Sequence, residues 1–164
     1  MKNNFRTILL SVTLILFIVL VSCNPSAKYE KAEASEIQDY LAKNSSLKFE
    51  LKPSGLYYLD TKVGTGRTPI NKDTVYIKYT GKFLNGTTFD TNVGTTDTLI
   101  FPVFQNYMIA GFEEGISYMK EGGKALTVVP SSLAYGTMGH YMIGGYTPLL
   151  FDVELVKVKA GPGK

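Results

Sequence analysis

The sequence predicts an α+β domain in which an antiparallel sheet covers one short helix. Two segments, 75–80 and 149–158, alternate apolar and polar residues with the period of a half-buried strand. The pair Asn85-Gly86 follows the first of them and favours a hairpin turn. Only one segment of the same region, 110–119, has a convincing helical period. Strands therefore outnumber helices.

The first strands are predicted at 56–60 and 75–80. Gly64, Gly66 and Pro69 interrupt the chain between them. We expect Asn85-Gly86 to form a tight two-residue turn, in which both central residues take a positive φ. A partner strand would then run through 88–90.

The second half of the domain contains the helix. A short strand at 98–101 is stopped by Pro102. The helix at 110–119 has an apolar stripe and an acidic first turn, where carboxylates favour the positive end of the helix dipole. Strands are predicted at 125–129 and 149–158.

Composition excludes several classes of function. The chain has 17 basic and 14 acidic residues, and loss of Lys2 and Arg6 with a leader would leave 15 against 14. This near neutrality gives no basic surface for nucleic acid. One cysteine and one histidine cannot form a Cys/His zinc site or an internal disulfide. We therefore expect no metal, no cofactor and no nucleic-acid partner.

Residues 1–22 are typical of a signal peptide. Lys2 and Arg6 precede an apolar run from Ile8 to Val21, which is shorter than the roughly 20 residues of a membrane-spanning helix. An aliphatic residue, Ser22 and Cys23 close the run and resemble the lipobox of bacterial lipoproteins. Cys23 would then be acylated and become the first mature residue. The alternative is an uncleaved anchor with an incidental cysteine.

We expect residues 23–53 to form a lipidated N-terminus and a polar spacer, with a helix predicted at 29–43. The spacer is interpreted as a stalk between lipid and domain, and the alternative is a dimerising or docking helix. Pro53-Ser54-Gly55 marks the boundary of a domain at 54–160, and 161–164 form a tail.

Five motifs in fixed order carry a family resemblance. They are Tyr79-Thr80-Gly81, Gly86 to Asp90, Gly111 to Gly115, Ala134-Tyr135-Gly136 and Phe151 to Leu155. Together they resemble the FKBP-type peptidyl-prolyl cis-trans isomerase domain over residues 56–158. The N-terminal arrangement is similar to lipidated envelope members of this family in bacteria of the Bacteroidetes type. The resemblance implies a curved antiparallel sheet of five or six strands wrapped over one short helix.

The resemblance also implies a site between helix and sheet. Its catalytic residues would be Tyr79, Phe89, Asp90 and Tyr135, with Asp90 as a carboxylate at the buried edge. Its substrate-binding residues would be Leu99, Met108, Ile109, Phe112, Ile143 and Phe151. The implied reaction is rotation about X-Pro bonds of exported proteins, with proline-containing polypeptides as partners and macrolides as inhibitors.

Two departures from the family pattern stand out. The chain has no Trp, and Phe112 occupies the position where the family commonly places one. The loop after Tyr135 contains Gly144-Gly145 where relatives often have two prolines, so we expect a more mobile lid. His140 is interpreted as an exposed loop residue that does not act as a general acid or base.

Two other functions stay open at this point. The domain could grip proline-containing chains without catalysis, as a chaperone or scaffold, or be a structural part of an envelope assembly. A lipid anchor places the protein in the cell envelope facing the periplasm, and Asn24 favours the outer over the inner membrane. The oligomeric state, the clients and the residue preferred before proline are not specified by the sequence.

Overall fold

The computed structural model describes residues 25–162. The predicted signal peptide, Cys23 and the last two residues of the predicted tail lie outside this range. The chain divides into two compact units, residues 1–31 and 32–164. Helix α2 (Pro25–Lys43) begins in the first unit and continues into the second. No helix within 25–162 has the length and apolar character needed to span a bilayer.

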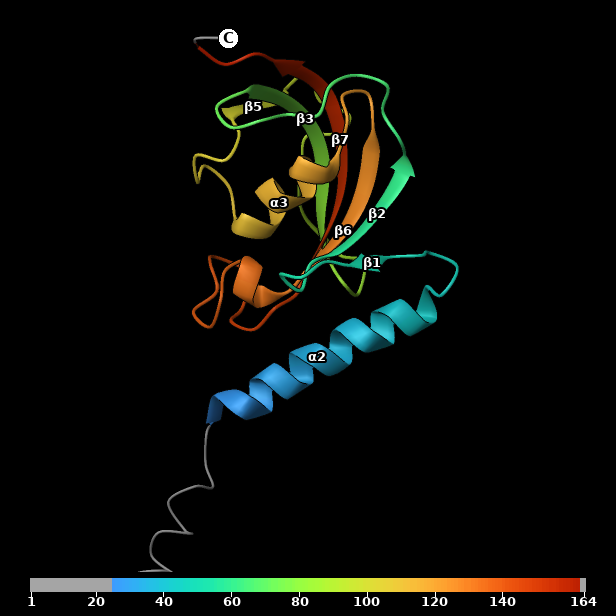
Figure 1. Cartoon of the computed structure of the whole chain (residues 1–164). Helices are drawn as coiled ribbons and strands as arrows, with labels where there is room; N and C mark the ends of the chain where they lie inside the picture. The colour runs from blue at the N-terminus through green and yellow to red at the C-terminus, as the bar shows by residue number, and fades with distance from the viewer. Residues whose placement is uncertain (1–24, 163–164) are drawn as a thin grey trace, which may run out of the picture. The chain divides into compact units, whose positions relative to one another are not determined.

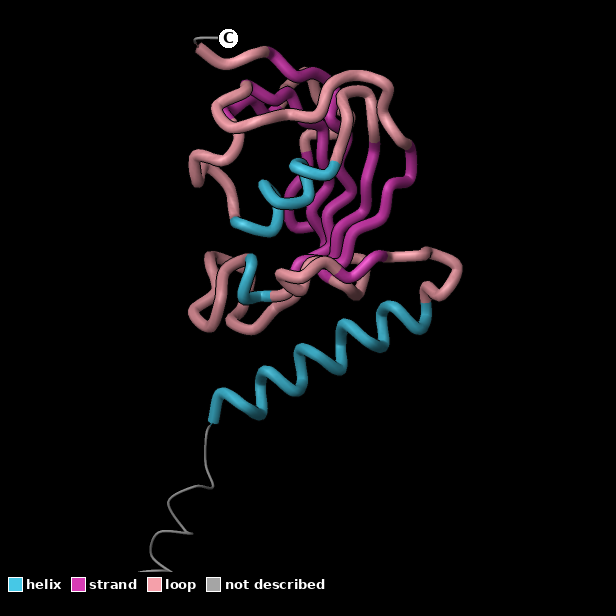
Figure 2. Tube along the Cα trace, viewed as in Figure 1, coloured by secondary structure: helices cyan, strands magenta, loops and turns pink. Residues whose placement is uncertain are grey.

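The second unit contains one antiparallel sheet that curves around helix α3 (Ala110–Tyr118), as Figures 1 and 2 show. Its path is β1-β2-β6-β7-β3-β4, and β5 pairs with the remaining half of the β3 edge. The strands are β1 (Glu50–Leu51), β2 (Tyr57–Lys62), β3 (Thr74–Phe83), β4 (Thr88–Thr91), β5 (Leu99–Pro102), β6 (Lys124–Val129) and β7 (Leu149–Lys159). The predicted α+β class is confirmed. The sheet of the described residues counts seven strands because the two-residue β1 adds to the edge of β2.

The core lies between the sheet and α3. In β7, Phe151, Val153 and Leu155 are buried while Asp152 is exposed, as the alternating pattern predicts. Phe112, Ile116 and Met119 are buried from the helical segment and pack in the same cluster. The helix therefore stands on the apolar face of the sheet and brings Phe112 to it.

The hairpin between β3 and β4 differs from the predicted turn. Gly86 has φ 93°, but Asn85 is not among the residues with positive φ. The Gly86 N–H donates to the Phe83 carbonyl (2.9 Å), and the Phe83 N–H donates to the Thr87 carbonyl (2.9 Å). This is a longer loop in which only Gly86 takes the left-handed conformation, so the two-residue turn is wrong.

Residues 32–43 of α2 pack on the domain, which corrects the prediction of a free stalk over these residues. Ile37 is buried against Val128 and Leu150, on the face of the sheet opposite α3. Tyr40 and Leu41 pack at the edge of the same cluster. The spacing of Ile37, Tyr40 and Leu41 places them on one side of the helix, and this side is the docked one.

The end of the sheet is closed by a buried carboxylate. Asp73 has no exposed surface and precedes β3. It accepts hydrogen bonds from the N–H groups of Ile70 (3.0 Å) and Gly161 (3.0 Å), and it pairs with Arg67. Asp73 thus ties the segment after the last strand to the start of β3.

Candidate active site

Four aromatic rings from different elements meet between α3 and the sheet. They are Tyr79 of β3, Phe89 of β4, Phe112 of α3 and Phe151 of β7. Phe151 lies 5.1 Å from Phe112 and 5.8 Å from Phe89 between ring centroids, and Tyr79 lies 5.6 Å from Phe112. These three pairs have edge-on geometry, which places the positive ring edge against the negative face. We call these four residues the ring cluster.

Gly81 allows the rings to reach this arrangement. A Cβ at position 81 would lie 2.6 Å from the Phe89 ring and 3.1 Å from the Phe151 ring. Both rings thus occupy space that any other residue would fill. This gives a physical reason for glycine in the Tyr79-Thr80-Gly81 motif.

The Tyr79 hydroxyl donates a hydrogen bond to the Asp90 carboxylate. Burial raises the pKa of the Tyr79 hydroxyl, and the hydrogen bond and charge of Asp90 raise it further. The phenol therefore stays protonated over the whole physiological range. Asp90 itself is exposed rather than at a buried edge, which corrects that part of the prediction.

Two residues that sequence reasoning missed hold the site in place. Asn92 accepts from the Tyr79 N–H (2.8 Å) and donates to the Ile77 carbonyl (3.0 Å), which fixes the strand beside Tyr79. Glu113 is buried and accepts from the N–H groups of Tyr107 (2.9 Å) and Met108 (3.2 Å). The sequence predicted Glu113 only as an acidic residue in the first turn of the helix. Its hydrogen bonds fix the backbone of the segment that leads into α3.

Tyr135 lies in the loop after η1 (Ser131–Leu133) and packs at the edge of the core cluster. Burial raises the pKa of its hydroxyl, and the Asp90 charge adds to this effect. The imidazole of His140 stacks on the Tyr135 ring at 5.2 Å between centroids. His140 is exposed as predicted, but the stacking contact was missed.

The remaining predicted binding residues belong to the same packed cluster. Ile143 is buried, and Leu99, Met108 and Ile109 are half-buried against the core. Nine of the ten predicted site residues thus lie in or against the hydrophobic core of the domain, and Asp90 is linked to that core through its hydrogen bond with Tyr79.

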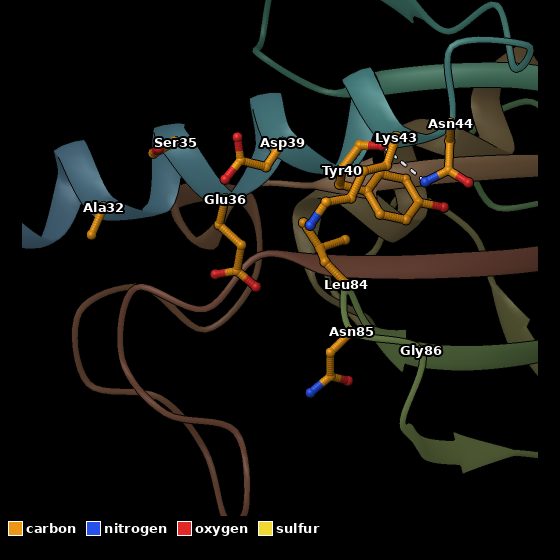
Figure 3. Close-up of a pocket in the computed structure, with 10 residues that line it drawn as sticks. All are labelled: Ala32, Ser35, Glu36, Asp39, Tyr40, Lys43, Asn44, Leu84, Asn85 and Gly86. Carbon is orange, nitrogen blue, oxygen red and sulfur yellow. Dashed lines mark hydrogen bonds between the residues drawn. The ribbon is translucent and has the colours of Figure 1, made fainter.

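A surface hollow of about 660 Å³ lies apart from the ring cluster. Figure 3 shows that it opens between α2, which contributes Glu36, Tyr40 and Lys43, and the hairpin tip with Leu84 and Asn85. Burial raises the pKa of the Glu36 carboxyl, and the charge of Glu33 adds to it. None of the predicted site residues lines this hollow. Across 25–162 there is also no group of three His, Cys, Asp or Glu residues placed to hold a metal ion.

Comparison with known proteins agrees with this architecture. The sequence pattern of the family described as FKBP-type peptidyl-prolyl cis-trans isomerase matches residues 65–156. A probable FKBP-type isomerase FkpA of Neisseria meningitidis is 38% identical over 82% of this chain and 47% of its own length. FkpA of Escherichia coli is 35% identical over 92% of this chain and 56% of its own length. The crystal structure of Escherichia coli FkpA superposes with a TM-score of 0.71 at 34% identity, covering 93% of this chain and 73% of that one.

The sheet, the helix that it encloses and the ring cluster define an α+β domain with aromatic side chains gathered between helix and sheet. The chain belongs to the FKBP-type peptidyl-prolyl cis-trans isomerase family. It spans about half the length of the curated relatives cited above.

Proposed function

We propose that this protein catalyses cis-trans isomerisation of X-Pro peptide bonds in polypeptides. The observation that carries the proposal is the ring cluster, which gathers four aromatic side chains from three strands and one helix beside Tyr135. Family membership supports the same activity.

The proposed mechanism needs no nucleophile. Rotation about the amide faces a barrier of about 18–20 kcal/mol because resonance stiffens the bond. The twisted state has lost the charge separation of the resonance form and is therefore less polar than the planar state. It loses less hydration free energy than the planar state when it leaves water. An apolar, aromatic surface therefore binds the twisted state better than the ground state, and this difference accelerates the rotation.

Tyr135 and Asp90 have separate roles in this proposal. The Tyr135 hydroxyl donates to the carbonyl flanking the proline and holds one side of the bond while the other rotates. Asp90 orients Tyr79 by accepting a hydrogen bond from the Tyr79 hydroxyl. Loss of Asp90 should weaken catalysis without abolishing it.

The test is the isomerisation rate of a short X-Pro peptide with the wild-type protein and with Asp90→Val and Tyr135→Phe. We expect a wild-type rate well above the uncatalysed rate and a loss of about tenfold in kcat/KM for Asp90→Val. Asp97→Val, at an exposed loop position, is the matched control. A wild-type rate equal to the uncatalysed rate would overturn the proposal. If the protein nevertheless binds the same peptide, it is a non-catalytic binding module.

We further propose that Cys23 is acylated after removal of residues 1–22 and that the protein is held in the cell envelope. The supporting observation is the order of the basic start, the apolar run and the single cysteine of the chain. Several acyl chains on one residue give stable anchoring where one chain is marginal. Metabolic labelling with a fatty-acid analogue should mark the wild type and leave Cys23→Ser unmarked. Fractionation of the cell membranes then shows whether the labelled protein is in the inner or the outer membrane.

A further inference from the structure

A buried carboxylate of α2 reaches the segment that bears Tyr135. Glu33 is only 9% exposed, and both of its oxygens are used. One accepts the backbone N–H of Ser131 and the other accepts the Ser131 hydroxyl at 2.7 Å. The two residues are 98 positions apart in the chain. Among residues 25–162, the ion pairs do not include Glu33.

Ser131 in turn braces the backbone on both sides of Tyr135. Its carbonyl accepts the N–H of Ala134 (2.9 Å) and the N–H of Gly136 (2.8 Å). The Gly136 carbonyl then accepts the Tyr146 N–H (2.9 Å), which closes the loop that follows. An unbroken series of hydrogen bonds therefore runs from Glu33 through Ser131 to the residues flanking Tyr135.

This series begins at a charge in a buried position. A carboxylate that loses its hydrogen bonds there would have to be solvated again, and this favours keeping both bonds. Hydrogen bonds to an ionised acceptor are shorter and about twice as strong as neutral ones. Ile37, one turn further along α2, lies buried against the sheet on the same side of the helix and fixes the position of Glu33. Ser131 is thus held from outside its own loop.

We propose that Glu33 is a positioning residue for Tyr135, so that docking of α2 sets the place of the Tyr135 hydroxyl. The inference rests on the proposed isomerase function. Glu33 does not contact the ring cluster, and it acts only through Ser131. The helix before the family domain is therefore part of the catalytic unit.

The experiment compares Glu33→Gln and Glu33→Ala with Asp39→Asn, a control that makes the same carboxylate-to-amide change at an exposed position of the same helix. On a short X-Pro peptide we expect kcat/KM to fall about tenfold in Glu33→Ala, less in Glu33→Gln, and not at all in Asp39→Asn. Amide hydrogen exchange at Ala134 and Gly136 should become faster in the Glu33 variants alone. Circular dichroism at the assay temperature establishes that each variant is folded. If Glu33→Ala does not fold, Glu33→Gln and Ser131→Ala provide the same comparison.

A double-mutant cycle separates positioning from general destabilisation. In a Tyr135→Phe background, where the hydroxyl is absent, Glu33→Gln should cause no further loss of kcat/KM. A loss of the same size in both backgrounds would overturn the proposal, as would wild-type kcat/KM in both Glu33 variants. If the wild-type protein itself shows no catalysis, the proposed function has failed. The exchange rates of the two amides then still decide whether Glu33 holds the Tyr135 segment.

Discussion

At the scale of single residues, the ring cluster depends on the lack of a side chain at Gly81. Gly81 lies near the C-terminal end of β3, where the Phe89 and Phe151 rings close over its Cα. Its role is steric, because its φ is not in the left-handed region. The ring cluster and the backbone of β3 are thus packed directly against each other.

Gly81→Ala should therefore destabilise the protein and disturb the ring cluster. The added methyl meets two rings in a packed core, and overpacking of this kind costs about 1–3 kcal/mol. Urea unfolding measures the loss of stability, and the peptide assay should show a parallel loss of kcat/KM. The control is Gly144→Ala, where a Cβ meets only the Thr147 hydroxyl at 3.4 Å. Equal stability of the two variants would contradict this account of Gly81.

At the scale of elements, residues 32–43 of α2 pack as part of the domain although the composition of the helix is that of a solvated one. Its mean hydropathy is low, and in the second unit only Ile37 among its apolar residues is fully covered. Ile37, with Tyr40 and Leu41 at the edge of its cluster, packs residues 32–43 on the sheet, and Glu33 ties them to Ser131 of η1.

Ile37→Ala should cost about 2 kcal/mol or more in the free energy of unfolding, because it removes a buried side chain and leaves a cavity against Val128 and Leu150. Ile100→Ala makes the same change at a position that is 52% exposed, and it should cost less than about 1 kcal/mol. Urea unfolding of both variants checks the difference. A cost at Ile37 no larger than that at Ile100 would show that α2 does not contribute to stability.

The loop 137–146 combines internal hydrogen bonds with an apolar surface. His140 and Ile143 exchange two backbone hydrogen bonds (2.8 and 2.9 Å), and Ile143 is buried. Met138, Tyr141 and Met142 are 91, 96 and 72% exposed. Exposed apolar side chains beside a site mark surfaces that bind other molecules. This tip borders Tyr135 through the stacked His140.

We expect simultaneous replacement of Met138, Tyr141 and Met142 by serine to spare isomerisation of a short peptide but to slow the proline-limited refolding of an unfolded protein substrate. The long chain can contact the loop tip and the site together, whereas the short peptide reaches the site alone. Refolding followed by fluorescence, with an equal peptide rate as internal control, checks the prediction. Equal losses on both substrates would place these residues inside the peptide site.

The same elements show what sequence reasoning can and cannot reach. Alternation in 149–158 predicted the strand, because burial on one face imposes the two-residue period. The order of the motifs carried the family resemblance, and the resemblance implied the residues of the ring cluster. Asn92, Glu113 and Glu33 were not identified as structural residues. Each acts through hydrogen bonds to backbone groups, and a hydrogen bond leaves no periodic pattern. Docking of α2 was left open because Ile37, Tyr40 and Leu41 are a narrow apolar stripe in a polar helix, and such a stripe does not say what it packs against.

At the scale of the whole molecule, stability should fall in alkaline solution. Burial raises the pKa of the Tyr58 hydroxyl, and its hydrogen bond to Asp60 (2.6 Å) and that carboxylate's charge raise it further. The pKa of Tyr79 is raised in the same way. In the unfolded chain both groups ionise near their ordinary pKa of about 10. Below that pH the two hydroxyls are protonated in both states, and their contribution to the free energy of unfolding is constant. Above it they ionise in the unfolded chain before they ionise in the folded protein, and this ionisation stabilises the unfolded state.

The free energy of unfolding should therefore decrease as pH rises above about 10, by up to about 1.4 kcal/mol per pH unit for the 4% exposed Tyr58. Tyr58→Phe removes this part of the slope and leaves the slope due to Tyr79. Urea unfolding at a series of pH values measures both. A slope unchanged in Tyr58→Phe would show that Tyr58 titrates normally in the folded protein.

The strand order has a consequence for how the molecule is made. β7 is the last strand of the described residues, but it lies between β6 and β3, and it pairs with ten residues of β3. The Gly161 N–H on Asp73 then locks that pairing at its far end. A ribosome releases the N-terminal part first, so β3 and β6 lack their shared neighbour until β7 has emerged. The sheet can thus be completed only after all of its other strands have been synthesised.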